Sequence, residues 1–173
     1  MHLCRYGPVL LPLAAFALAS VASSPIARGD GPSPGVQIVK GAAIAETIER
    51  AAPSPGGRGG VIAHDEGWRV HATERDGPGR AEMHEADTDV WYVLAGGATL
   101  VTGGTIVDAA VTGPGEHRGP AIRGGTEHAI AAGDLVSIRP GVPHWVKAVE
   151  ARLRYLTVKV HGRPVPAGAK RRP

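Results

Sequence analysis

The feature that most constrains this chain is a succession of short apolar or alternating runs between residues 60 and 160. Each run ends at Gly, Pro or Asp, which is the pattern of an antiparallel barrel or sandwich. We therefore predict strands over residues 61–64, 68–74, 81–85, 90–95, 98–102, 128–131, 135–138, 144–149 and 153–160. The last run alternates an apolar set with an amphipathic set, and one of the two is predicted to face the interior. The apolar set is Leu156, Val158 and Val160, and the amphipathic set is Tyr155, Thr157 and Lys159.

Three segments depart from this pattern. Ile44, Ile48 and Ala51 recur at helical spacing, which predicts one helix over residues 42–52 that ends at a proline. Residues 36–39 form a short strand candidate before it. Residues 103–126 read as one long connection rich in Gly and Pro. A connection of this length is predicted to be either functional or poorly ordered, and the sequence leaves its role open.

The first 22 residues have the pattern of a secretory signal peptide. Arg5 precedes an apolar run at residues 8–19 that is too short to span a bilayer, and small residues follow it. We predict cleavage after Ala22, with Ser24 and Ala27 as alternatives. A membrane anchor is disfavoured because two prolines interrupt the run. The predicted location is therefore the periplasm or the medium, with no membrane contact after cleavage.

The rest of the chain has the size of one ordinary domain. We expect a flexible linker at residues 23–35, a strand and helix at 36–59, a barrel at 60–162 and a basic tail at 163–173. Cys4 is the only cysteine and leaves with the signal peptide, so neither a disulfide nor a thiolate ligand is expected. The net charge is only +3 and aromatic residues make up 4%, which argues against a nucleic-acid partner.

Two stretches carry the candidate ligands of a metal ion. Glu82 and His84 are two residues apart, so they point to the same side of a strand. Asp89 follows on the next strand, and a Pro-Gly turn delivers His144. Two carboxylates and two imidazoles suit a divalent first-row metal. In the alternative interpretation, the acids are exposed and His84 is a satisfied polar residue at the rim.

Both stretches resemble the two motifs of the cupin superfamily, G-x5-H-x-H-x3–4-E-x6-G and G-x5-P-x-G-x2-H-x3-N. The matching positions are His84, Asp89 in place of Glu, Gly96, Gly133, Gly141 and His144. The departures are Glu82 in place of the first His, Arg139 in place of Pro and Ala148 in place of Asn. The resemblance covers residues 60–160, and the two motifs occur in the family's order.

The resemblance implies an all-β, single-domain cupin barrel (a double-stranded β-helix or jelly roll), here with one short helix before it. It also implies a metal inside the barrel, which with this ligand set would be Mn, Fe, Ni or Zn. Paired barrels are common in the family, so a homodimer is expected. The implied function is an exported metal-binding cupin acting on a small molecule, as a metal-dependent oxygenase or isomerase. The alternative is a non-catalytic cupin that binds or senses a small molecule, with a structural or vestigial metal site. Whether the chain is an enzyme stays open, and no catalytic residue is assigned.

The remaining polar residues near these stretches are expected to play smaller parts. Glu85 points away from His84 on the same strand and is left out of the ligand set. His71 lies within a strand and either lines the cavity or is packed. His117 and His128 are interpreted as structural residues.

Overall fold

The structure is a computed structural model that describes residues 35–162. The predicted signal peptide, the linker up to residue 34 and the basic tail lie outside the described residues. No helix in the described part is long and apolar enough to cross a bilayer.

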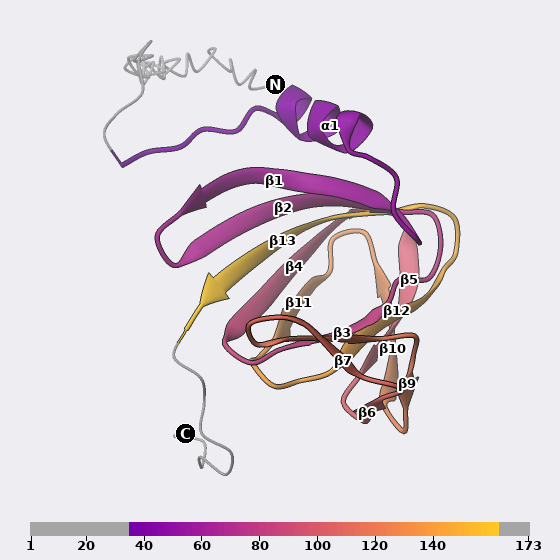
Figure 1. Ribbon diagram of the computed structural model, residues 1–173. Coiled ribbons are helices and arrows are strands. Elements are labelled where there is room, and N and C mark those ends of the chain that lie inside the picture. Colours follow the sequence, from indigo (N-terminus) through magenta and orange to yellow (C-terminus); the bar gives the residue numbers. More distant parts are fainter. Residues whose placement is uncertain (1–34, 163–173) are drawn as a thin grey trace, which may run out of the picture. The chain divides into compact units, whose positions relative to one another are not determined.

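Two antiparallel sheets form the domain and face each other (Figure 1). The strands are β1 (Arg58–Asp65), β2 (Trp68–Arg75), β3 (Ala81–His84), β4 (Asp87–Ala95), β5 (Gly97–Thr102), β6 (Thr105–Ile106), β7 (Ala110–Gly113), β8 (Glu116–Gly119), β9 (Ile122–Arg123), β10 (Thr126–Ala131), β11 (Leu135–Ile138), β12 (His144–Val149) and β13 (Leu153–His161). One sheet has the order β1-β2-β13-β4-β11, the other has the order β10-β5-β12-β3-β8-β7, and β6 pairs with β9. The prediction of an all-β fold with one helix before it is confirmed.

The helix α1 (Gly41–Arg50) lies close to its predicted range, and Pro53 follows its end. It buries Ile48 and lies against β1 (Figure 1). The strand predicted at residues 36–39 is wrong. These residues precede the helix without pairing with another strand, and the Ile38 side chain is 74% exposed. Gln37 instead donates a side-chain hydrogen bond to the His64 carbonyl oxygen at 2.8 Å.

The single long connection predicted at residues 103–126 is also wrong, because it folds into four short strands, β6 to β9. The strand β8 pairs antiparallel with β3, and Glu82 lies directly opposite Arg118 in that register. Its other edge pairs with β7. Hydrogen bonding to a barrel strand therefore orders a segment whose composition suggested a loop.

The core occupies one end of the space between the sheets. The inward face of β4 carries Asp87 and Asp89 first, and then Trp91 and Val93. The Trp91 ring packs on the Tyr155 ring with centroids 4.8 Å apart. The apolar half of β4 therefore belongs to the core, and its acidic half lies at the polar end of the space between the sheets. On β13 it is the amphipathic set that faces this interior, since Tyr155 and Thr157 are buried.

One glycine fixes the turn between β4 of one sheet and β5 of the other. Gly96 joins β4 to β5 with a φ of +77°, a region that residues with a Cβ rarely occupy. A Cβ at this position would lie 1.9 Å from the Arg152 carbonyl oxygen. The glycine that closes the first motif is therefore required both by its backbone angle and by the neighbouring chain.

Candidate metal centre

The structure brings the four predicted ligand residues together at the polar end of the barrel. Glu82 and His84 lie on β3, Asp89 on β4 and His144 on β12, so both sheets contribute. One ligand atom from each lies within 4.8 Å of all the others. His84, Asp89 and His144 are at most 3% exposed. His144 lies directly opposite Glu82 in the pairing of β12 with β3.

The Pro-Gly turn before β12 is tied to the strand that carries His84. Gly141 has a φ of +77°, and its N–H donates to the His84 carbonyl oxygen at 2.8 Å. This hydrogen bond holds the two motifs side by side. The spacing between the turn and His144 therefore sets where that imidazole enters the site.

Both imidazoles are oriented by a partner outside the cluster. His84 Nδ1 lies 2.8 Å from Glu116 Oε2, and His144 Nδ1 lies 3.0 Å from the Val142 carbonyl oxygen. Carbonyl and carboxylate oxygens accept, so both Nδ1 atoms carry the hydrogen. The Nε2 lone pairs are then directed toward the carboxylates. This is the usual arrangement of metal-binding histidines.

The two carboxylates are ionised although they are buried. Burial raises the pKa of Glu82, but His144 when its imidazole is protonated, together with Arg118 and Lys159, lowers it well below its usual range. Arg118 Nη1 lies 2.7 Å from Glu82 Oε2. Burial likewise raises the pKa of Asp89, but His84 when its imidazole is protonated, together with Lys159, lowers it below the ordinary value. The cluster therefore offers two anionic oxygen donors at neutral pH.

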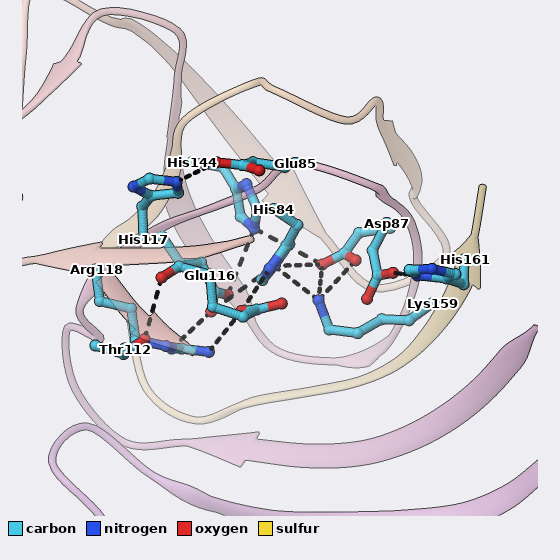
Figure 2. Close-up of polar contacts among 12 residues, drawn as sticks. His84, Glu85, Asp87, Thr112, Glu116, His117, Arg118, His144, Lys159 and His161 are labelled. Atoms are coloured by element: carbon cyan, nitrogen blue, oxygen red, sulfur yellow. Dashed lines mark hydrogen bonds and ion pairs between the residues drawn. The ribbon is translucent and has the colours of Figure 1, made fainter. Parts of the chain in front are cut away.

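One cation already lies inside the cluster. Lys159 Nζ is 2.7 Å from His84 Nε2 (Figure 2). It also lies 2.7 and 2.8 Å from the two oxygens of Asp89. Two protonated nitrogens cannot share a 2.7 Å contact, so with Lys159 charged the contact describes a neutral imidazole. Burial and Lys159 lower the pKa of His84, but Asp89 and Glu82 raise it by more, so this pKa lies above its ordinary value. A proton on Nε2 would compete with Lys159 for Asp89.

The four residues fit a divalent ion. His144 Nε2 lies 3.4 Å from Glu82 Oε1 and 3.7 Å from Asp89 Oδ2, and His84 Nε2 lies 3.6 Å from Asp89 Oδ2. Ligands about 2.1 Å from a common ion are separated by roughly 3 to 4 Å. His144 Nε2 is also buried without a hydrogen-bond partner, as expected of a nitrogen that has a metal to bind.

The remaining histidines stay outside this set. Glu85 and His117 pair with each other at 2.7 Å, and the Glu85 side chain is 55% exposed, so it faces away from the cluster. His128 contacts the Thr102 hydroxyl at 2.9 Å. His71 Nε2 is buried without a partner. Burial, together with Arg69 and Lys159, lowers the pKa of His71, so this imidazole is neutral.

Sequence reasoning missed Glu116, Arg118 and Lys159. The first two lie on β8, inside the segment interpreted as a loop. Their spacing of two residues was the available signal, since it places both side chains on one face of a strand. Lys159 belongs to the amphipathic set of the last strand, which the prediction left unassigned to either face.

Space for a small molecule exists beside the cluster. A hollow of about 280 Å³ reaches His84 and is lined by Arg69, Asp87, Glu116 and His161, among others. A larger groove of about 540 Å³ lies on β5, β10 and β11 and touches none of the four ligand residues. Of these two spaces, only the smaller hollow is lined by a residue of the candidate centre, His84.

No protein-family model and no curated protein matches this chain. Solved structures do match it. An uncharacterised conserved protein with a double-stranded β-helix domain from Klebsiella pneumoniae is 17% identical, with a TM-score of 0.50 over 70% of this chain and 90% of that one. The chain has the cupin fold. The fold that the two motifs predicted is thereby confirmed.

Two further structures are similar to this chain. KdgF from a Halomonas species is 17% identical, with a TM-score of 0.47 over 64% of this chain and 84% of that one. Oxalate decarboxylase from Bacillus subtilis is 14% identical, with a TM-score of 0.49 over 71% of this chain and 30% of that one.

Proposed function

We propose that this chain is an exported cupin that binds one divalent metal ion through Glu82, His84, Asp89 and His144. The observation that carries the proposal is the orientation of the two imidazoles. Outer partners fix the hydrogen of each ring on Nδ1, and both Nε2 atoms face two ionised carboxylates. The donors are oxygen and imidazole nitrogen, which supports Mn, Fe, Ni or Zn.

The proposed activity is that of a metal-dependent oxygenase or isomerase acting on a small molecule. A metal bound here would act as a Lewis acid that polarises its ligand. Glu116 and the Val142 carbonyl keep the histidines in the metal-binding tautomer. Arg118 keeps Glu82 ionised. The hollow beside His84 supports a ligand of small size.

A second candidate function is a cupin that binds or senses a small molecule without catalysis. The observation that favours it is Lys159, whose ammonium group contacts two of the four ligand residues. In that case the metal site is structural or vestigial. Assaying the metal-loaded protein for turnover of small molecules separates the two candidates, since a structural site also binds an ion but only the first candidate converts its ligand.

We further propose that the protein works in the periplasm or medium as a homodimer, without nucleic-acid partners. The pattern of residues 1–22 supports export. The edge strand β11 supports pairing, because it leaves Leu135 68% exposed at the end of its sheet.

The metal proposal is tested by metal analysis and by titration of the metal-free protein with Mn²⁺, Fe²⁺, Ni²⁺ and Zn²⁺. Wild-type protein should bind one ion. His84→Ala and His144→Ala should each lose more affinity than the roughly 10- to 100-fold typical of removing an outer partner. Glu85→Ala is the matched control, since this carboxylate is adjacent in sequence but points outward. Wild-type protein that binds no ion in stoichiometric amount would contradict the proposal.

A further inference from the structure

Lys159 reaches the candidate centre from β13. Its backbone lies directly opposite Asp89 in the pairing of β13 with β4. Its side chain is 12% exposed, and the ammonium group lies among the ligand residues (Figure 2). An ammonium group has three N–H donors. The two oxygens of Asp89 and His84 Nε2 accept all three.

We propose that Lys159 is a tethered cation that occupies the place of the metal in the metal-free protein and that an entering ion must displace. The inference rests on the proposed metal-binding function. Lys159 contacts His84 Nε2 and the Asp89 carboxylate, the atoms whose lone pairs these two ligand residues would give to the ion. The other two ligand residues, Glu82 and His144, make no hydrogen bond with Lys159.

The charges of the cluster are balanced pair by pair. Arg118 neutralises Glu82 at 2.7 Å, and Lys159 neutralises Asp89 at 2.7 Å. Because each buried carboxylate has its own counter-ion, the metal-free site does not depend on an ion to offset repulsion between Glu82 and Asp89. A divalent ion adds two positive charges beside the ammonium group, which repels it. The flexible four-carbon stem of the lysine allows the group to swing away.

Two effects of opposite sign follow for a variant without this charge. Metal affinity should rise, because the ion no longer competes with a cation for His84 and Asp89. Stability of the metal-free protein should fall, because the buried Asp89 loses its counter-ion. A lysine with only a structural role would give the second effect without the first.

The test compares wild-type protein with Lys159→Met, which keeps much of the apolar stem and removes the charge. Lys159→Gln is the second variant, since its amide can still donate to Asp89 if the methionine variant folds poorly. Lys147→Met is the matched control, because Lys147 pairs with Glu127 on the barrel surface. Metal-free samples are titrated with Mn²⁺ and Zn²⁺ by calorimetry, and their melting temperatures are measured with and without the ion.

The expected result is a gain in metal affinity on the order of 10- to 100-fold in Lys159→Met or Lys159→Gln, from removal of a buried competing charge. The metal-free melting temperature should fall in the same variants and recover with the ion, while Lys147→Met matches wild type. If wild type binds the ion and neither variant binds more tightly, the inference is overturned and the proposed function stands. If only the variants bind, the inference stands and the proposed function of the wild type fails. If no form binds, both are overturned.

Discussion

The contact between Glu116 and His84 gives the sharpest test of how the candidate centre is built. Replacing Glu116 by alanine removes the only acceptor within hydrogen-bond distance of His84 Nδ1 among the described residues. The carboxylate is 27% exposed and lines the hollow, so water can replace it without leaving a buried polar group unsatisfied. The expected damage therefore falls on the site and not on the fold.

The size of the effect follows from what the contact does. With Glu116 present, the hydrogen of His84 is held on Nδ1 and the Nε2 lone pair faces the cluster. Without it, the ring can take the other tautomer or turn, and the ion must restore the binding arrangement. Loss of such an outer partner typically costs 10- to 100-fold in metal affinity, which is about 1.4 to 2.7 kcal/mol. Glu116→Gln keeps an acceptor oxygen and should lose less.

The measurement is the dissociation constant for Zn²⁺ or Mn²⁺ together with the melting temperature of the metal-free protein. The control is Glu85→Ala, which breaks the equivalent 2.7 Å contact between Glu85 and His117 on the outside of the barrel. Glu116→Ala should weaken binding and leave the metal-free melting temperature close to that of wild type. If Glu116→Ala binds the ion within twofold of wild type while His84→Ala does not bind it, the orienting role assigned to Glu116 is refuted.

Three further predictions concern the fold, export and assembly. Gly96→Ala should destabilise the protein by more than ~2 kcal/mol in chemical denaturation, since a Cβ would meet the Arg152 carbonyl oxygen at 1.9 Å. Gly67→Ala has a similar φ of +81° but open space around it, so its smaller loss isolates the clash; equal losses would contradict this account. Intact-mass measurement of exported protein should show cleavage after Ala22 or a neighbouring small residue, and retention of Met1 on soluble protein would end the export proposal. Light scattering at micromolar concentration should give the mass of a dimer, and a monomeric mass would count against the paired barrel.

The residues of the candidate centre could be predicted where their spacing follows local geometry. Glu82 and His84 share a strand face because side chains alternate. His144 could be placed because a Pro-Gly turn fixes where the next strand begins, and Gly141 does form that turn. Alternation also predicted which residues of β4 face the core, since Trp91 is buried and Tyr92 on the opposite face is 47% exposed.

The rest of the site depends on pairing between distant parts of the chain. The strand β8 reads E-H-R-G, which has no apolar alternation, and it becomes a strand because β3 offers an unpaired edge. Glu116 lies 32 residues from His84, so no local pattern indicates their contact. The inward orientation of Lys159 could not be predicted, because charged side chains ordinarily face water. The inward carboxylate of Asp89 overrides that rule by providing a counter-ion.

The division of the site between strands makes it modular. The four candidate ligands are carried by β3, β4 and β12, whereas Glu116 and Arg118 belong to an excursion at residues 105–123 on the edge of one sheet. The buried apolar cluster around Trp91 and Leu100 draws no residue from that excursion. Substitutions at Glu116 and Arg118 therefore leave the residues of this apolar cluster unchanged. They would alter the basicity of His84 and the charge beside Glu82 while β8 keeps its pairing with β3.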